Sequence, residues 1–362
     1  MKYPQISSLS LSRRTSLLFF HALFGLSCSC FVNASYAQEI SEPKQSHVFS
    51  AIEENDYLYN PKRGEHQDRH YTQGQKFIYL EGGEPWWAKG LGLPQLSEHL
   101  PNLGINPKSS SFGLTLGQNV YTPQNNLATN LLRFDRPYAG WLYLGAVMQR
   151  RGEVFGNIPV LESFELDLGV IGPEAQAGQG QNKLHNFEGI PGFDGWGNQI
   201  KTEPAFVLKY GRAWKLAFNE KSGHYFDVIP NIGANLGTVM VSGNAGVMTR
   251  LGFNLPDDFG VQMIDSPITL SAGSSPPIGA YIFGQVEGRA VGRNTFLDGN
   301  LYRDSFHVKK ETFVGDLSYG VALSVGKHFD LSYTRVVRTR EFVLQEGYDR
   351  FGSLVATIKW GF

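Results

Sequence analysis

Large apolar residues alternate strictly with small or polar residues near the C-terminus, and this pattern constrains the fold most. Over residues 317–325, Leu, Tyr and Val occupy every second position, with Ser, Gly and Ala between them. The pattern recurs over residues 353–362, and the chain stops on the aromatic Phe362. Successive side chains of a strand point to opposite faces, so each segment predicts a strand with one apolar face.

Twelve such segments follow one another along the chain. A membrane β-barrel alternates lipid-facing apolar residues with lumen-facing small or polar residues over about ten positions. An even number of strands lets one chain close, and closure leaves no unpaired backbone edge in lipid. The sequence therefore predicts an all-β fold, a twelve-stranded antiparallel transmembrane β-barrel. The predicted strand cores are 48–59, 70–80, 110–121, 140–150, 162–171, 203–216, 224–239, 243–254, 279–292, 313–326, 329–342 and 351–362.

Two features of the predicted barrel point to a bacterial outer membrane. A terminal aromatic on an amphipathic strand resembles the C-terminal signal of outer-membrane barrels. Several aromatic residues lie near strand ends, where interfacial girdles are expected. They are Trp141, Tyr143, Trp214, Tyr281 and Trp360.

The first 37 residues have the features of a cleaved secretory signal peptide. Three cationic residues precede an apolar run over 17–26, and a cleavage-site pattern ends at Ala37. We expect cleavage before Gln38, which leaves 38–362 as one outer-membrane β-barrel with an active site at its rim. Both cysteines of the chain lie in this leader, so no disulfide is expected in the barrel.

Composition argues against other classes of protein. After the leader, no apolar run approaches the roughly 18 residues that a membrane helix needs. The chain has 32 Lys and Arg, of which the leader holds three, and 33 Asp and Glu. This slightly acidic balance does not indicate a nucleic-acid partner. We expect a monomer in the outer membrane.

Strand parity assigns each connection to one side of the membrane. With both termini in the periplasm, the connections after odd-numbered strands face outside. Asn55 and Asp56 then lie near the outer end of the first strand, and Thr72 lies near the outer start of the second. These residues are expected to be neighbours at the outer rim. Two even-numbered connections, 81–109 and 255–278, are longer than periplasmic turns usually are.

The third outer connection, 172–202, is too long for a plain turn, which predicts a functional extracellular loop. We expect a short helix over 179–188. Gln181 and His185, four residues apart, would project from one face of that helix.

Six short motifs occur between residues 48 and 216. They are ENDYLY at 54–59, YTQG at 71–74, DRPYAGWLYLG at 135–145, LGVIGP at 168–173, QNKLH at 181–185 and GWGNQIKTEPA at 195–205. Together, and in this order, they resemble the outer-membrane lipid A 3′-O-deacylases of the LpxR type. The later half of the chain agrees with that family only in its strand pattern.

The resemblance implies a twelve-stranded barrel whose outer rim hydrolyses the ester of the 3′ acyl group of lipid A with the help of calcium. The substrate and partner would be lipid A of lipopolysaccharide. The family also has a carboxylate shortly after the His, and Glu188 is the nearest acid here, with Asp194 and Glu203 further on. The site residues implied by the motifs are Asn55, Asp56, Thr72, Gln181 and His185.

Elementary chemistry suggests a role for each of these residues. Ester hydrolysis by water needs a base that titrates near the working pH, and His has an unperturbed pKa of about 6.5. His185 fits that role. Asp56, helped by the carbonyl of Asn55, fits a calcium ion that stabilises the developing oxyanion. Gln181 or Thr72 fits a hydrogen bond to the substrate or to the attacking water.

Three further residues complete the predicted site. Glu188, bonded to the second ring nitrogen of His185, would fix the tautomer of the imidazole. Arg136 and Lys183 fit the phosphates of a phosphorylated sugar.

Each residue also has a purely structural explanation. Asp56 fits an acid bonded to a lumen Lys, Thr72 fits a strand former, and Arg136 fits a cap of the Asp135 turn. A non-enzymatic barrel, either a small porin or a lipopolysaccharide-binding protein, therefore remains an alternative.

An outer-membrane phospholipase is a second alternative, although the sequence has no G-x-S-x-G motif for serine chemistry. Zinc chemistry is disfavoured because His66 and His70, four residues apart, have no evident third ligand.

Overall fold

We describe a computed structural model of the chain. It describes residues 46–59, 68–189, 192–220, 223–266, 268 and 277–361, and within these ranges the side chains of 187, 188 and 218–220 are left aside. The predicted leader and His66 lie outside the described residues.

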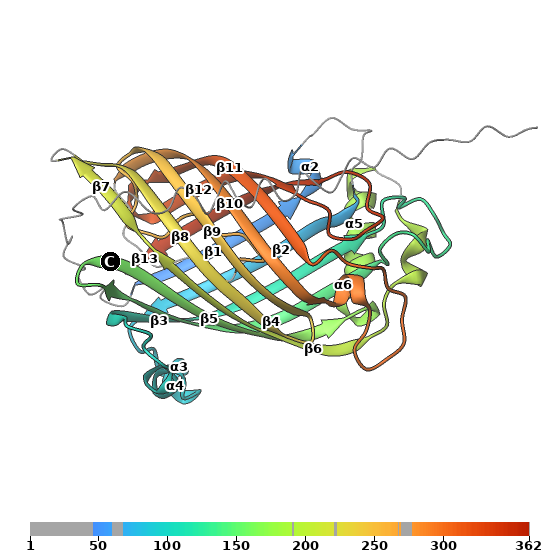
Figure 1. Ribbon diagram of the computed structural model, residues 1–362, viewed down its shortest axis with the longest axis horizontal. Helices are drawn as coiled ribbons and strands as arrows, with labels where there is room; N and C mark the ends of the chain where they lie inside the picture. The colour runs from blue at the N-terminus through green and yellow to red at the C-terminus, as the bar shows by residue number, and fades with distance from the viewer. Residues whose placement is uncertain are drawn as a thin grey trace, which may run out of the picture. The chain divides into compact units, whose positions relative to one another are not determined.

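The described residues form one antiparallel sheet that closes on itself (Figure 1). β1 pairs with both β2 and β13, and β6 pairs with β8, which joins the two ends of the sheet. β7 continues the line of β6 after Lys215 and pairs with the first part of β8. β6 and β7 therefore count as one strand of the barrel wall. The barrel therefore has the predicted twelve strands. Its elements are β1 (His47–Asn55), β2 (His70–Gly82), β3 (Asn106–Thr122), β4 (Ala139–Val154), β5 (Ile158–Ile171), β6 (Glu203–Trp214), β7 (Leu216–Glu220), β8 (Gly223–Gly237), β9 (Met240–Phe253), β10 (Ile278–Asn294), β11 (Phe313–Val325), β12 (Phe329–Arg338) and β13 (Asp349–Trp360).

The alternation that predicted the barrel is confirmed by burial. On β11, Leu317, Val321 and Leu323 are exposed on the outward face, whereas Ser318 and Ser324 are buried toward the lumen. β13 shows the same arrangement, with its small and polar residues inside. The period of two in the sequence thus corresponds to the two faces of the barrel wall, one toward lipid and one toward the lumen.

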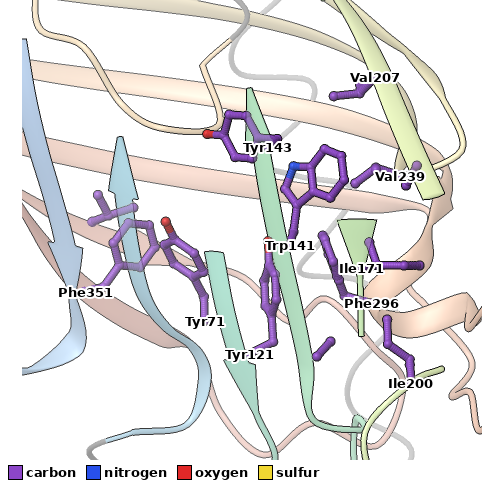
Figure 2. Close-up of a cluster of buried hydrophobic side chains, with 13 residues drawn as sticks. Tyr71, Tyr121, Trp141, Tyr143, Ile171, Ile200, Val207, Val239, Phe296 and Phe351 are labelled. Carbon is purple, nitrogen blue, oxygen red and sulfur yellow. The ribbon is translucent and has the colours of Figure 1, made fainter. Parts of the chain in front are cut away.

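A cluster of large side chains fills one part of the lumen (Figure 2). Trp141 stacks on Tyr143, and Tyr121 stacks on Phe296, so aromatic rings from both strands and loops meet inside the barrel. The expected girdle position is therefore wrong for Trp141 and Tyr143, and also for Tyr281, which is buried in a second lumen cluster. Each of these strands is apolar on both faces near the aromatic residue, and the large rings occupy the lumen.

Ion pairs occupy another part of the lumen. Nζ of Lys76 lies 2.6 Å and Nζ of Lys209 lies 2.9 Å from the same oxygen of Glu165. Lys209 also pairs with Asp167, at 2.8 Å. Buried charges are tolerated when they are paired and hydrogen-bonded, as these are.

The long connection between β9 and β10 enters the lumen instead of forming a periplasmic turn. Phe259 packs in the second lumen cluster, and Ile264 is fully buried against apolar residues of β1, β2, β4 and β13. The backbone amide of Ile264 donates to Glu54 near the outer end of β1, at 2.9 Å. We call residues 255–266 the lumen segment. It explains why this even-numbered connection is longer than a turn.

Helices lie in the connections at both ends of the barrel. Three helices follow odd-numbered strands of the twelve-stranded wall and belong to the predicted outer end. They are α2 (Asp56–Tyr59), α5 (Ala177–Glu188) and α6 (Thr295–Asp298). α3 (Trp86–Gly90) and α4 (Leu93–His99) connect β2 to β3 at the opposite end (Figure 1). Among the described helices, none is long and apolar enough to cross a membrane.

Candidate active site

A β-bulge at the outer start of β2 sets the position of Thr72. The register with β3 shifts between Tyr71 and Gln73, which leaves Thr72 without a partner in the ladder. Bulges redirect side chains and are common beside active sites. Here the hydroxyl of Thr72 lies 2.6 Å from the hydroxyl of Thr122.

The residues just before this bulge adopt an unusual backbone conformation. Asp68 and His70 have φ angles of 57° and 61°, in the left-handed region that non-glycine residues seldom occupy. The carbonyl of Asp68 accepts hydrogen bonds from Thr122 Oγ1 at 2.5 Å and from Asn126 Nδ2 at 3.1 Å. These two donors fix the turn, and backbone strain of this kind concentrates at functional sites.

The third outer loop packs α5 against the outward face of the wall. Val120 shares its face of β3 with the exposed Leu116, yet it is buried beneath Ala177 and Trp196. A Cβ added at Gly140 on β4 would lie 2.6 Å from Cβ of Ala177, so only glycine allows this close approach. The loop therefore covers the outside of the barrel at its outer end.

The predicted helix is confirmed, and it turns Gln181 and His185 to the same carboxylate. Both side chains are buried. Gln181 Nε2 donates to Asp68 Oδ1 at 3.4 Å, and His185 Nε2 lies 3.6 Å from that oxygen. Trp196 Nε1 donates to Gln181 Oε1 at 3.2 Å, which fixes the orientation of the amide.

Asp68 is the residue that sequence reasoning missed. It lies in the same polar stretch as Thr72, but nothing in the local pattern indicates that a loop more than a hundred residues away will bring His185 to it. The acid expected next to the imidazole was Glu188, whose side chain lies outside the described residues. Phe193 lies beside His185, with its ring perpendicular to the imidazole and the centroids 4.8 Å apart.

Asn55 and Asp56 lie at the outer end of β1, as predicted. Asn55 Oδ1 accepts from the amide of Tyr57 at 2.8 Å, and Asp56 Oδ2 accepts from the amide of Arg69 at 3.2 Å. The other carboxylate oxygen of Asp56 is buried and has no hydrogen-bond partner among the described residues. Burial and the nearby charge of Asp68 together raise the pKa of Asp56 well above its ordinary value.

Two carboxylates that destabilise each other's charge are suited to a divalent cation. Calcium takes six to eight oxygen ligands from carboxylates, carbonyls and water. The unpartnered oxygen of Asp56 and the carboxylate of Asp68 fit such an ion in charge and in chemistry. Within the described ranges, no group of three or more His, Cys, Asp or Glu side chains converges.

The two predicted phosphate-binding cations differ in exposure. Lys183 is exposed on α5. Arg136 is buried, with Nη1 donating to Glu341 Oε2 at 3.2 Å and the guanidinium over the ring of Tyr121. Arg136 therefore lies inside the barrel paired with Glu341, whereas Lys183 is open to solvent.

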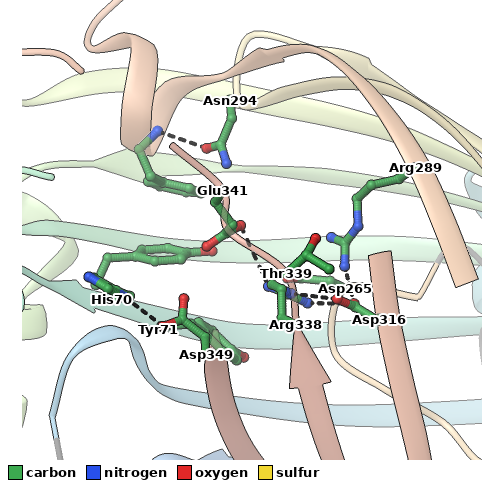
Figure 3. A network of polar contacts seen from close by, with 12 residues as sticks. His70, Tyr71, Asp265, Arg289, Asn294, Asp316, Arg338, Thr339, Glu341 and Asp349 are labelled. Carbon is green, nitrogen blue, oxygen red and sulfur yellow. Dashed lines mark hydrogen bonds and ion pairs between the residues drawn. The ribbon is translucent and has the colours of Figure 1, made fainter. Parts of the chain in front are cut away.

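A buried polar network includes His70, at the start of β2 next to the site (Figure 3). His70 Nδ1 lies 2.5 Å from Asp349 Oδ1, and its Nε2 lies 3.8 Å from Asp135 Oδ1. His70 therefore links the start of β2 to the start of β13 and to the β3–β4 loop. The same network contains Arg338, which donates to Asp316 at 3.0 Å.

Comparisons with known proteins give several structural matches. LpxR from Salmonella typhimurium has a TM-score of 0.65 and 19% identity, and the match covers 88% of this chain and 100% of that chain. The translocator domain of the autotransporter NalP from Neisseria meningitidis has a TM-score of 0.40 and 8% identity, with coverage of 96% of each chain. The β domain of the Bordetella autotransporter BrkA has a TM-score of 0.40 and 9% identity, with 88% and 100% covered. No curated protein gave a significant sequence match.

The family comparison covers nearly the whole chain. The sequence profile of the family described as "Outer membrane protein LpxR" matches residues 19–360. The twelve-stranded barrel and its outer-membrane location agree with this match. The chain therefore belongs to the family of outer membrane protein LpxR.

Proposed function

We propose that this barrel is a lipid A deacylase that hydrolyses the ester of the 3′ acyl chain of lipid A. Family membership supports the class of enzyme. The observation that carries the proposal is the convergence of His185 and Gln181 on Asp68, on the outward face of the wall at its outer end. An ester held in the outer leaflet can reach this position without entering the barrel.

His185 would act as the general base. Its imidazole takes a proton from water, the water oxygen attacks the ester carbonyl, and the proton then passes to the departing sugar hydroxyl as the ester bond breaks. The carboxylate of Asp68, 3.6 Å away, stabilises the imidazolium that forms in between. That contact becomes an ion pair once the imidazole is protonated, and it is too long for a hydrogen bond.

Gln181 and Thr72 would position the reacting groups. Trp196 holds the amide of Gln181, and Thr122 holds the hydroxyl of Thr72, so both side chains are ordered before substrate binds. Such preorganisation lowers the cost of reaching the transition state.

Calcium is the proposed cofactor, held by Asp56, Asp68 and the side-chain carbonyl of Asn55. When bound, the ion supplies positive charge for the oxyanion that develops on the ester carbonyl. Lys183, which is exposed on α5, would meet a phosphate of the lipid A sugar.

The alternatives are less well supported. A porin needs an open lumen, whereas the lumen segment and the buried ion pairs occupy this one. A phospholipase of the same architecture would differ in the headgroup that it accepts, which product analysis distinguishes.

Mass spectrometry of lipid A tests the proposal. Cells that express the native sequence should lose one ester-linked acyl chain from the 3′ position, and cells that express His185→Ala should not. His307→Ala is the matched control, since His307 is an exposed outer-loop residue away from the site. Intact lipid A with the folded native protein would refute lipid A deacylation, and lysophospholipid in those cells would indicate the phospholipase.

A further inference from the structure

The β2–β3 connection packs against the outside of the barrel wall. Phe112 shares its face of β3 with the lipid-exposed Leu114 and Leu116, but Phe112 is only 1% exposed. It is covered by Ala88 of α3, in a cluster that also contains Met148 of β4. We call residues 84–105 the outer-wall hairpin. Figure 1 shows α3 and α4 outside the barrel, beside the end of β3.

Charged side chains on the lipid-facing rows hold the outer-wall hairpin. Arg150 alternates in step with Leu144 and Met148, and Glu162 alternates in step with Leu166, so both residues lie on the outward face of the wall. Nevertheless, both are buried. Arg150 donates to Glu162 at 2.8 Å and to the carbonyl of Pro101 at 2.8 Å.

Further bonds extend this anchorage. Arg150 Nη1 also donates to the carbonyls of Ser97 and Leu100, each at 3.3 Å, and to Asn102 Oδ1 at 3.1 Å. Arg212 of β6 donates to the carbonyl of Leu103 at 2.9 Å. Charges on a lipid-facing row are unfavourable unless they are covered and paired. The hairpin is therefore fixed to the wall where the apolar belt ends on the periplasmic side.

The other side of the outer-wall hairpin exposes large apolar residues. Trp86 is 84% exposed, Leu91 is 64% exposed and Leu96 is 53% exposed. The adjacent β4–β5 turn exposes Phe155, at 88%. A cluster of exposed apolar residues marks a binding surface, and Trp is enriched where a membrane meets water.

We propose that the outer-wall hairpin is an interfacial anchor that inserts these residues into the phospholipid leaflet facing the periplasm. The reason for this occupant is continuity, since the hairpin packs directly on the lipid-facing rows of β3, β4 and β5 and extends their apolar surface outward. Helices that lie in the plane of the interface bind through buried apolar area in this way. The anchor would set the depth at which the barrel sits in the membrane, from the end opposite the proposed active site. This inference does not depend on the proposed activity.

Site-directed spin labelling tests the proposal directly. The chain has only two cysteines, Cys28 and Cys30, and both are replaced by Ser for this experiment. Single cysteines then replace Trp86 or Leu96, and the labelled protein is reconstituted in phosphatidylethanolamine and phosphatidylglycerol vesicles. Leu144→Cys on the apolar belt is the lipid control, and Lys327→Cys on the exposed β11–β12 turn is the water control.

We expect labels at Trp86→Cys and Leu96→Cys to collide more with oxygen than with a water-soluble nickel chelate, as at Leu144→Cys. Accessibility to the chelate equal to that at Lys327→Cys would overturn the proposal. Protection from both reagents would also overturn it, because it would mean that a protein or a second copy covers the surface. Both replaced side chains are exposed, and a gel-mobility shift on heating checks that each variant is folded.

Discussion

Oδ1 of Asp68 lies 3.6 Å from Nε2 of His185, although the two residues come from different outer connections of the barrel. The same oxygen accepts a hydrogen bond from Gln181. One carboxylate in a left-handed turn thus organises two side chains of α5. The proposed chemistry depends on this junction more than on any single strand.

Replacing Asp68 with Asn should reduce kcat. The amide keeps the shape of the side chain but removes the negative charge that stabilises the imidazolium. Two opposite charges about 4 Å apart attract by about 1 kcal/mol in water and about 4 kcal/mol near a protein surface, so a loss of about 2 kcal/mol predicts roughly a thirty-fold fall in kcat. Deacylation of purified lipopolysaccharide in detergent measures it. Asp304→Asn, which alters an exposed outer-loop acid, should leave kcat unchanged; an unchanged kcat for Asp68→Asn would remove Asp68 from the mechanism.

Removing calcium should abolish activity and lower the thermal stability of the outer loops. Chelation would remove the cation that we propose beside the buried oxygen of Asp56, and adding calcium back should restore both properties. Isothermal titration should detect calcium binding to the native protein but much weaker binding to Asp56→Asn. Equal binding to both proteins would place the ion elsewhere.

Replacing Thr72 with Val should weaken the site without unfolding the barrel. The substitution keeps the branched shape and removes the hydroxyl that meets Thr122 at 2.6 Å. A neutral hydrogen bond contributes about 1 kcal/mol, which predicts roughly a five-fold fall in kcat/KM. The control is Thr249→Val on β9, whose hydroxyl lies on the exposed part of the wall. Equal losses in the two variants would show that the effect is not specific to the site.

Asp257 should stabilise the barrel over most of the pH range. Burial raises the pKa of its carboxyl, but Lys215 and Arg151 outweigh burial and lower that pKa from 3.8 to about 2. A lowered folded-state pKa means that the stabilisation is complete above the ordinary value and disappears as pH falls through about 2. Asp257→Asn should therefore lower the free energy of unfolding near neutral pH by about 3 kcal/mol.

Urea unfolding in detergent at a series of pH values measures this difference. The gap between Asp257→Asn and the native protein should close as pH approaches about 2. Lys215→Met combined with Asp257→Asn should recover part of the loss, because both charges of the pair are then removed. A gap that does not change with pH would indicate lost packing instead of a lost charge.

Local periodicity was enough to predict the strands, because lipid on one side and a packed lumen on the other impose a period of two. The helix over α5 followed from the length of its loop, and the positions of Asn55, Asp56 and Thr72 at the rim followed from strand parity. Trp141 and Tyr143 were misplaced because they alternate with Leu142 and Leu144, so both faces of that strand are apolar and the pattern cannot distinguish them.

The sequence alone did not predict which connections meet in the folded chain. Asp68 meets His185 only because α5 folds back along the wall. The lumen segment and the outer-wall hairpin are both long even-numbered connections, yet one enters the barrel and the other covers its outside. Their sequences contain the necessary partners, such as Asp257 for Lys215, but pairing across the barrel is not a local property.

The lumen segment also has a consequence for the cell. The outer membrane is a permeability barrier, and every barrel inserted into it is a possible leak for ions, detergents and antibiotics. Phe259 and Ile264 of the lumen segment pack among lumen side chains, so this segment of the chain plugs the barrel. A plugged barrel can therefore be present in many copies without raising the permeability of the outer membrane.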